Sequence, residues 1–542
     1  MVHHQPPDRL RTLGYSRSVL FVVNTVASAN RLLDVVPLFE ADLRVQLVFT
    51  TPPNSTVTDG VAEVFAELDV LAIPWEQVVR RDFDLAITAN HSGELHRLRA
   101  PVVVISHGVG YSKKAPIRPE PRAQSPEPRA QSPEPRAQSP AYGLSPEWLL
   151  HNGKLVADTL VFAHEEQVGR LAATVPEALP AAFVAGDPCF DRILASTSRR
   201  PSYRQALGCD DNTTLIVASS TWRAGSAFGS WPTFLRRLLA ELPPDRHRVA
   251  AVLHPHVWHG HSPHQIRAWL ADCVRAGLIL IPPLEGWRAA LIAADIVVGD
   301  HGAVTCYAAA LGKPVALVAF DEHEIVDGTA VSTMVNLAGI LDQHAPLLPQ
   351  LESARTQWPG VRDLVSSRPG EAASLLRSLC YQRLGLPEPD TGIVEPPLSL
   401  AGLHTGVGVQ AYAVSSEINP DATIRLARRR ADVRPIPAGP THLVVHADHP
   451  IREHRTNADI LFTEQSDNLA TLFAQAPGCR IAVSATTGTA RIRSQERPIR
   501  LHDCDPLLAA SALFTVITAG GEPPTEMRIV ADGQTYSCSL SS

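Results

Sequence analysis

Short, continuously apolar segments alternate with helix-like segments through the first half of the sequence. Strands are expected at 18–24 (SVLFVVN), 44–50 (RVQLVFT), 84–90 (DLAITAN) and 101–106 (PVVVIS), with helices between them. Strands that are apolar without a polar/apolar alternation are buried on both faces, which is typical of a parallel sheet covered by helices. Such sheets bind ligands at the carboxyl ends of their strands. The sequence therefore predicts an α/β fold whose binding residues lie in the turns after the strands.

A second set of alternating segments follows the first. Its strands are expected at 214–219, 248–253, 277–281 and 295–299, and a later helix at 370–384 is expected to cross back onto the first set. Two doubly wound halves whose strand ends face one another leave a cleft at their junction, where a ligand can bind. We therefore expect a pair of Rossmann-like domains that face a cleft.

The chain is long enough for several domains, and its composition suggests where they divide. We expect an N-terminal Rossmann-like domain at 1–165, a second Rossmann-like, nucleotide-binding domain at 166–386, a proline- and acid-rich linker at 387–399 and a small α+β domain at 400–542. The first domain carries a proline-rich loop at 116–146, in which the unit PEPRAQS occurs three times in succession. Its proline content excludes helix and central strand, so a solvated loop is expected.

Charge and hydropathy exclude several classes of function. Net charge is −7 and there is no basic run, so nucleic acid is not expected as a partner. No apolar run reaches the roughly 20 residues that a membrane helix needs, and the N-terminus has no signal-peptide core. The eight cysteines are scattered, as in reduced proteins. We expect a cytoplasmic protein, with peripheral contact to a membrane left open.

The segment 294–315 (ADIVVGDHGAVTCYAAALGKPV) reads as a strand, a tight turn, an alanine-rich helix and a second strand. A helix that starts directly after a strand exposes unpaired backbone N–H groups and the positive end of its dipole. Phosphate groups bind at such ends, so the turn is a candidate phosphate site; an ordinary capped turn is the alternative.

Other strand ends carry the same chemistry, with hydroxyl, imidazole or cationic groups directly after the apolar run. Together with the turn at 300–305 they give one set of candidate donor-binding residues: Ser220, Thr221, Arg223, His254, His256, Asp300, His301, Gly302 and Thr305. The chain has only four lysines, and three of them fall in or beside these turns as candidate phosphate contacts: Lys113, Lys114 and Lys313. Because the strand ends of parallel sheets converge, we expect these groups to share one cleft.

The order of these motifs resembles one known family. The motifs are His107-Gly108 with following lysines, Gly186-x-Pro-x-x-Asp191, Ser-Ser-Thr221-Trp-Arg223, His254-Pro255, and Asp300 with a later Lys313-Pro314. This order is similar to that of the CDP-glycerol glycerophosphotransferases of teichoic-acid synthesis, which are metal-independent enzymes with the GT-B fold. The similarity covers roughly residues 100–325.

The resemblance implies a role for each matched residue. His107 corresponds to the general base that takes the proton from an acceptor hydroxyl. Thr221, Arg223 and His254 would contact the diphosphate of a nucleotide-activated donor, and the turn at 300–305 would hold a phosphate or the ribose. No cofactor and no metal are implied, because helix ends and cationic side chains can spread the charge of the leaving group. The partners implied are the donor and a hydroxyl-bearing acceptor.

Two departures from the family pattern keep other functions open. The arginine of the family's Pro-Arg pair is Cys189 here, and its Tyr-Ser-Ser after the aspartate is His301-Gly302-Ala303. A His-Gly pair at this turn resembles the nucleotide-sugar glycosyltransferases of the same fold. The alternatives are therefore a GT-B glycosyltransferase or epimerase that uses a nucleotide sugar, and a non-catalytic GT-B scaffold whose C-terminal domain binds a partner. The donor base, the acceptor and the oligomeric state stay open.

Four histidines gather in sequence within the C-terminal part, at His442, His446, His449 and His454. The segment 441–446 (THLVVH) reads as a strand, and the last two histidines follow it in a loop. No metal is expected, because no cysteine or carboxylate arrangement completes a site around them.

Overall fold

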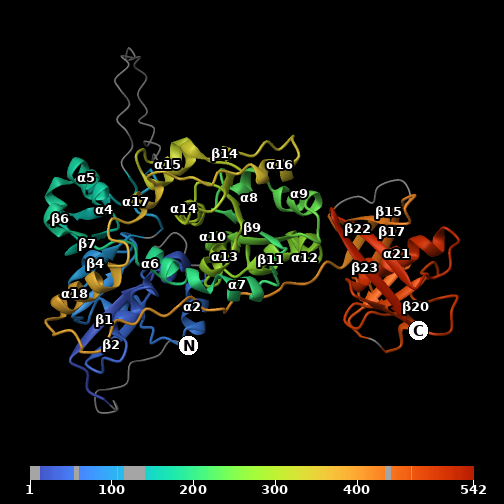
Figure 1. Ribbon diagram of the computed structural model, residues 1–542. Helices are drawn as coiled ribbons and strands as arrows, with labels where there is room; N and C mark the ends of the chain where they lie inside the picture. Colours follow the sequence, from blue (N-terminus) through green and yellow to red (C-terminus); the bar gives the residue numbers. More distant parts are fainter. Residues whose placement is uncertain are drawn as a thin grey trace, which may run out of the picture.

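The computed structural model describes residues 13–53, 60–106, 108–114, 141–433, 441–465 and 467–541. His107 and most of the predicted proline-rich loop lie outside these ranges. Figure 1 shows two α/β domains side by side and a β-barrel at one end of the molecule.

The first domain is built on a six-stranded parallel sheet in the order β2-β1-β3-β4-β7-β8. Its strands are β1 (Arg17–Val22), β2 (Val45–Thr50), β3 (Leu85–Thr88), β4 (Val102–Ile105), β7 (Thr159–Phe162) and β8 (Ala182–Val184). The centre of β1 is buried on both faces, as its unbroken apolar run predicts. Because β8 belongs to this sheet, the first domain continues past residue 165, where the sequence had placed its boundary.

Short helices cover both faces of this sheet and complete the domain. They are α1 (Val26–Leu32), η2 (Val36–Phe39), α2 (Val61–Glu67), α3 (Trp75–Val78), η3 (Leu95–Arg97), α4 (Pro146–Leu149), α5 (Glu165–Thr174) and η4 (Pro176–Ala181), with a small hairpin of β5 (Leu150–His151) and β6 (Lys154–Leu155). Helix α1 starts at a capping box. The Thr25 hydroxyl accepts the backbone N–H of Ser28, and the Ser28 hydroxyl accepts the backbone N–H of Thr25.

The second domain holds another six-stranded parallel sheet, in the order β11-β10-β9-β12-β13-β14. Its strands are β9 (Thr214–Ser220), β10 (His247–Leu253), β11 (Leu278–Ile281), β12 (Ile296–Gly299), β13 (Val315–Leu317) and β14 (Gly339–Ile340). This is the order of dinucleotide-binding Rossmann domains, in which the direction of winding reverses between the first and fourth strands. The reversal lies between β9 and β12, so the ligand crevice is expected at their carboxyl ends.

The helices of the second domain lie on both faces of its sheet. They are α6 (Pro188–Ala195), η5 (Thr197–Arg199), α7 (Arg200–Ala206), α8 (Ala227–Ser230), α9 (Phe234–Glu241), α10 (Pro255–His261), α11 (Pro263–Trp269), α12 (Ala271–Arg275), α13 (Trp287–Ala293), α14 (Ala303–Ala310), η6 (Glu322–Glu324), α15 (Ala330–Leu337), α16 (Leu347–Glu352) and α17 (Val361–Val365). The following helix, α18 (Ala372–Leu384), packs on the first domain through residues such as Leu376 and Tyr381, which confirms the predicted crossing.

The C-terminal domain is a closed barrel, a more specific architecture than the predicted α+β module. Its strands are β15 (Ala411–Ile418), β16 (Ile424–Arg430), β17 (Thr441–His446), β18 (Ile460–Thr463), β19 (Ile481–Ser484), β20 (Thr489–Ile492), β21 (Ile499–His502), β22 (Glu526–Ala531) and β23 (Gln534–Ser541), with helices α19 (Arg452–Thr456), α20 (Leu469–Leu472) and α21 (Pro506–Thr518). Residues 507–514 of α21 are all buried, because this helix is apolar on every side and packs among the barrel strands.

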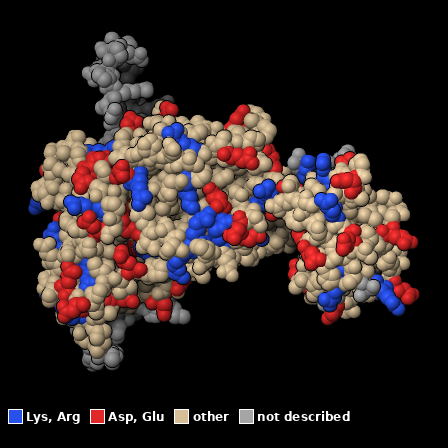
Figure 2. Space-filling view, in the orientation of Figure 1, with Lys and Arg blue, Asp and Glu red and all other residues tan. Residues whose placement is uncertain are grey.

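The barrel is fixed to the second domain by two buried arginines of β16. Arg428 forms ion pairs with Asp245 and with Asp505, the latter at 2.8 Å. Arg430 donates to the carbonyl oxygens of Leu239 and Leu242, at 2.9 and 2.6 Å, and also to that of His247. The carbonyls of Leu239 and Leu242 belong to the carboxyl end of α9 and its cap, which favours a cation, and that of His247 belongs to the start of β10. In the view of Figure 2, acidic and basic side chains are interspersed over both the domains and the barrel.

Candidate functional site

A cavity of about 150 Å³ lies between the two α/β domains. The first domain contributes α1 and the turn after β4, through Ala27, Asn30, Arg31 and Gly108. The second domain contributes the ends of β9, β10 and β11 and the first turns of α13 and α14. The cavity therefore lies at the carboxyl ends of the strands, beside the reversal between β9 and β12, where the topology predicts a ligand.

Asp300, directly after β12, supports this site from behind. Its side chain is fully buried and accepts four hydrogen bonds, from the backbone N–H groups of Thr221, Ala227 and Gly302 and from the Thr221 hydroxyl, at 2.8–3.0 Å. Each carboxylate oxygen is thus occupied. Asp300 holds the two turns of the reversal together, and the structure does not place it among the residues that line the cavity.

Thr221 and Gly302 meet at the cavity wall and both line it. A Cβ atom on Gly302 would lie 2.5 Å from the Thr221 methyl carbon and 3.0 Å from Asp300 Oδ1. Only glycine therefore fits at this position, which is the residue before the first residue of α14. Ser220 also lines the cavity, and its hydroxyl accepts the backbone N–H of Phe228 at 2.9 Å.

His254 lines the cavity from the end of β10. Its Nδ1 accepts the backbone N–H of His256 at 3.1 Å, which caps α10. A ring nitrogen that accepts is unprotonated, so in the neutral imidazole the proton is on Nε2, which is then a donor. His256 lies outside the cavity wall, with its ring 4.7 Å from that of Trp222.

Four further predicted residues gather beside the cavity rather than in its wall, around Glu324. Arg223 lies 3.4 Å from one Glu324 oxygen and stacks over Trp222, and His301 Nε2 lies 3.2 Å from the other oxygen. The backbone of Lys113 pairs with Ile325. Lys113 is exposed to solvent. Desolvation of its ammonium by the surrounding protein nevertheless lowers its pKa, and the negative charges of Glu324 and Asp300 oppose this shift.

Lys114 joins the same pairing, and its ammonium donates to the Glu322 carbonyl at 3.2 Å. This pairing joins the turn after β4 of the first domain to the loop after β13 of the second. Arg223 has a φ of 83°, a left-handed conformation that is uncommon for a residue other than glycine and occurs often at functional sites.

Two predicted site residues lie away from the cavity. The Lys313 ammonium donates to the carbonyl oxygens of Ile292 and Ala294, at 2.9 and 2.7 Å, and thereby caps the carboxyl end of α13. Desolvation lowers its pKa to about 8. Thr305 is fully buried in α14, and its hydroxyl lies 2.3 Å from where a Cβ on Gly299 would stand. Both residues thus hold together the elements around β12 and α14.

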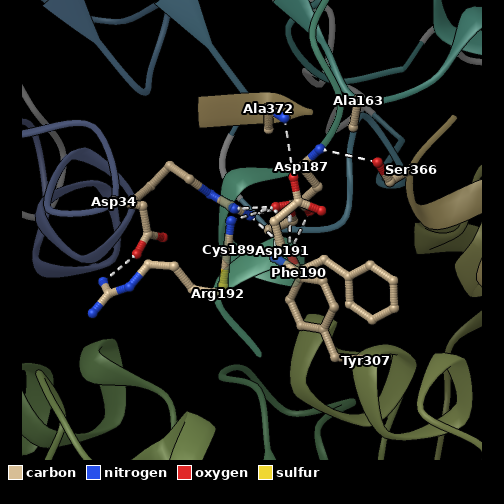
Figure 3. Close-up of polar contacts among 12 residues, drawn as sticks. Asp34, Ala163, Asp187, Cys189, Phe190, Asp191, Arg192, Tyr307, Ser366 and Ala372 are labelled. Atoms are coloured by element: carbon tan, nitrogen blue, oxygen red, sulfur yellow. Dashed lines mark hydrogen bonds and ion pairs between the residues drawn. The ribbon is translucent and has the colours of Figure 1, made fainter. Parts of the chain in front are cut away.

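Sequence reasoning missed a buried ion pair that joins the two domains at the cavity. Arg31 of α1 lies 2.5 Å from Asp187. Tyr307 of α14 donates to the same carboxylate at 2.6 Å, and Figure 3 labels both Tyr307 and Asp187. Asp187 also caps α6 by accepting the N–H groups of Cys189 and Phe190. The only signal in the sequence was an aspartate directly before a proline, which is typical of a helix start. Its partners lie 156 and 120 residues away.

A second buried cluster, also missed, lies beside the first. Asp34 accepts Arg192 at 2.7 Å and Arg288 at 2.9 Å, and Arg288 Nε donates to Cys189 Sγ at 3.2 Å. Arg288 lines the cavity. The available signal was an arginine inside the otherwise apolar helix WRAALIA, because a lone cation in a buried helix needs a specific partner.

Asp191, the last residue of the Gly-x-Pro-x-x-Asp motif, has a structural role in this arrangement. Its carboxylate accepts the backbone N–H groups of Gly370 and Ala372, at 2.7 and 3.1 Å, at the start of α18. Burial raises its pKa to about 6, and these two hydrogen bonds oppose the shift. The motif thus holds the returning helix in place.

In the barrel, the structure brings two of the four predicted histidines together. His449 and His454 lie with Asp432 so that one ligand atom of each is within 4.8 Å of the others. The sequence had offered no carboxylate, because Asp432 lies on a preceding strand end. However, Asp432 also accepts Arg275 at 2.7 Å, and His449 Nδ1 accepts the Ile451 N–H, which leaves the proton on the Nε2 that faces Asp432. Asp432 thus accepts hydrogen bonds from His449 and from Arg275, and its ion pair with Arg275 connects the barrel to α12.

Two Rossmann-like domains that face one another across a cavity at their strand ends define a GT-B-like fold. No family model matches the sequence, and no curated protein matches it. Within the described residues, no helix is both long and apolar enough to cross a membrane.

Solved structures of similar fold include the wall teichoic acid polymerase TagF, at 12% identity and a TM-score of 0.46 over 68% of this chain and 89% of that one. MnaA of S. aureus, in a structure with UDP, has 11% identity and a TM-score of 0.42 over 70% of this chain and 100% of that one. A putative UDP-N-acetylglucosamine 2-epimerase from Listeria monocytogenes has 14% identity and a TM-score of 0.40 over the same shares. These TM-scores are all below 0.5, so the likeness indicates neither a family nor an activity for this chain.

Proposed function

We propose that the protein is a transferase that binds a nucleotide-diphosphate donor in the interdomain cavity and moves a glycerophosphate or related group to a hydroxyl acceptor. The observation that carries this proposal is the cavity itself. It joins the reversal point of a Rossmann sheet, the N-terminus of α14 and the turn after β4 of the facing domain. These are features with which α/β proteins bind nucleotides and their phosphates.

The residues of the cavity fit an anionic donor. The first backbone N–H groups of α14, next to Gly302, stabilise negative charge. His254 adds a donor, because its Nδ1 accepts the His256 N–H and the proton of the neutral ring is therefore on Nε2. The apolar part of the wall, including Pro282, Pro283 and Trp287, suits a base or a sugar ring. Charge that develops on the leaving nucleoside monophosphate would be stabilised by these prearranged dipoles.

His107 is the proposed general base, which would take the proton of the acceptor hydroxyl. Its neighbour in the chain, Gly108, lines the cavity and supports this assignment. A His107→Ala variant should bind donor as the native protein does and lose roughly 10²- to 10⁴-fold in turnover. Unchanged turnover in this variant would remove His107 as the base.

The test of the whole proposal is a binding screen by calorimetry with CDP-glycerol, UDP-sugars and GDP-sugars. Saturable binding of one of them, followed by nucleotide release when an acceptor is present, is expected. Failure of the native protein to bind any nucleotide would contradict the proposal and favour a non-catalytic scaffold.

A nucleotide-sugar transferase or epimerase is the second candidate, favoured by one observation. The residue at the helix start is Gly302, where a side chain would collide with Thr221, and the family that the sequence resembles has hydroxyl residues at this turn. The wall therefore lacks two of that family's polar groups. The released nucleotide separates the two functions, because CMP marks phosphotransfer while UDP or GDP marks sugar transfer.

A further inference from the structure

The cavity contains a guanidinium that the motif pattern did not predict. In the Gly-x-Pro motif, the family that the sequence resembles has an arginine where this chain has Cys189. Arg288, from a different helix, places its Nε 3.2 Å from the Cys189 sulfur. A guanidinium thus lies against position 189 although the residue there is neutral. Burial raises the pKa of the Cys189 thiol, which keeps it uncharged.

The charges around Arg288 do not balance. Asp34 accepts both Arg288 and Arg192, one on each carboxylate oxygen, so one negative charge faces two positive ones. Among the described residues, Asp34 is the only carboxylate that forms an ion pair with Arg288, and Glu285 adds only a longer-range attraction. The neighbouring pair of Arg31 and Asp187 is neutral in itself. The cluster therefore holds one positive charge in excess.

Arg288 also has an unused donor. It is 2% exposed and lines the cavity, and its Nη1 has no hydrogen-bond partner among the described residues. A buried donor of a charged group that lacks a partner is costly, because it has left water without a replacement. An anion in the cavity would supply both the missing acceptor and the missing charge.

We propose that Arg288 binds the diphosphate of the donor and so replaces the arginine that is absent at position 189. The proposal deepens the function proposed above and rests on it for the identity of the ligand. A guanidinium is suited to this role, because its planar fork matches two phosphate oxygens at once. Arg288 is the member of the Asp34 cluster that faces the ligand, whereas Arg192 is not part of the cavity wall.

The test compares Arg288→Leu with Arg192→Leu. Each variant removes one partner of Asp34 and leaves the other, so thermal unfolding should shift by a similar amount in both. Calorimetric titrations use pyrophosphate, CDP and UDP as probes. Arg288→Leu should weaken binding roughly 10- to 100-fold, the loss expected for a charge-assisted hydrogen bond, and Arg192→Leu by less than about threefold.

The outcomes separate this inference from the proposed function. If the native protein binds a nucleotide and Arg288→Leu binds it equally well, the inference is overturned and the function stands. If the native protein binds pyrophosphate but no nucleotide, and Arg288→Leu loses pyrophosphate, the inference stands and the nucleotide donor is overturned. Equal losses in the two leucine variants, or no binding of any probe by the native protein, also overturn the inference.

A second variant decides the question if Arg288→Leu does not fold. Arg288→Lys keeps the positive charge beside Asp34 but lacks the second arm of the fork, so pyrophosphate binding should weaken by several-fold. Unchanged binding in Arg288→Lys would overturn the assignment.

Discussion

At the scale of single residues, buried carboxylates hold the turns beside the cavity in place. Asp300 joins the turns after β9 and β12, and Asp187 joins the start of α6 to Arg31 and Tyr307. Both are fully or almost fully buried. A buried carboxylate that accepts several hydrogen bonds fixes the backbone around it, so the groups that face the cavity are already in place before a ligand arrives.

The first prediction concerns Asp300. An Asp300→Asn change replaces one accepting oxygen by an NH₂ group and leaves at least one buried N–H unpaired, which should cost roughly 2–3 kcal/mol in the free energy of unfolding. Denaturant titration measures the loss. The control is Asp321→Asn. Asp321 likewise accepts a backbone N–H, that of His323 at the start of a short helix, but this hydrogen bond is exposed. Equal losses in the two variants would contradict the role given to Asp300.

The sequence located four residues of the cavity wall on the second domain, and the reason is local. Ser220, Thr221, His254 and Gly302 follow apolar strands directly, so a strand prediction also places their side chains at the strand ends. Asp300 was located by the same reasoning, but its role was not. Whether a carboxylate faces a ligand or the backbone depends on the neighbouring turn, which belongs to another strand.

At the scale of elements, the barrel helix α21 shows how a fully buried helix is specified. Its residues 507–514 are apolar or small, with one exception, Ser511, whose hydroxyl is buried and has no hydrogen-bond partner among the described residues. The all-round apolar pattern agrees with a helix enclosed by strands. The serine is the one position that opposes burial.

Replacement of this serine should stabilise the barrel. Ser511→Ala removes an unpaired buried hydroxyl and adds a better helix former, so the free energy of unfolding should rise by about 1 kcal/mol. The reverse change one residue earlier, Ala510→Ser, introduces a buried hydroxyl and should lower it by a similar amount. Thermal unfolding of both variants tests the pair, and a loss of stability in Ser511→Ala would show that the hydroxyl has a partner.

The strand β17 gives the barrel a pH dependence. His442 is buried against Phe514, with the ring centroids 4.7 Å apart, and desolvation lowers its pKa from 6.5 to about 4. The neutral form is therefore favoured in the folded state. This contribution to the free energy of unfolding is fully present above pH 6.5 and is lost as the pH falls towards 4. The loss at pH 4 should amount to roughly 2–3 kcal/mol.

A His442→Leu variant isolates this contribution. Between pH 7 and pH 4.5 the native protein should lose more stability than the variant, when both are measured by urea unfolding at each pH. The leucine keeps the apolar contact with Phe514 and cannot take up a proton. Parallel curves for the two proteins would contradict the assignment to His442.

At the scale of the whole molecule, buried arginines of one strand attach the barrel to the second domain. Buried positions of β16, among them Arg428 and Arg430, alternate with more exposed ones. A single strand therefore supplies part of the barrel wall and also the arginines that bind the second domain. Arg430 stabilises the carboxyl end of α9, and its pKa is lowered to about 10 by burial, which leaves it charged at neutral pH. The orientation of the barrel thus depends on a few specific contacts.

Removal of Arg430 should release the barrel without unfolding it. Arg430→Leu leaves three carbonyl groups of the second domain without their donor, at a cost of roughly 3 kcal/mol to the attachment. We expect a larger radius of gyration in small-angle scattering and faster proteolysis of the segment 387–410. The matched control is Arg425→Leu on the exposed face of the same strand, which should change neither. An unchanged radius for Arg430→Leu would contradict this account.

Sequence reasoning predicted the two-domain fold and the return of the helix at 370–384, but not the side-chain pairs that join the domains. Strand and helix patterns depend on neighbours along the chain, whereas Arg31 and Asp187 are 156 residues apart, and Arg288 and Asp34 are 254. Their pairing depends on the packing of complete domains. The same limit explains the barrel, because its closure joins β16 to β22 across a hundred residues of chain.

The return of α18 has a practical consequence. The polypeptide passes from the first domain (the first lobe) to the second domain (the second lobe) before α6. It comes back at Gly370, whose backbone N–H donates to the Asp191 carboxylate. The chain therefore crosses between the two lobes at two points, and hydrogen bonds from Gly370 and Ala372 to Asp191 hold these points together. A recombinant first lobe that ends near residue 186 would expose the surface normally covered by Leu376 and Tyr381 and should precipitate. Grafting 370–386 onto it through a short glycine-rich tether should yield a soluble half.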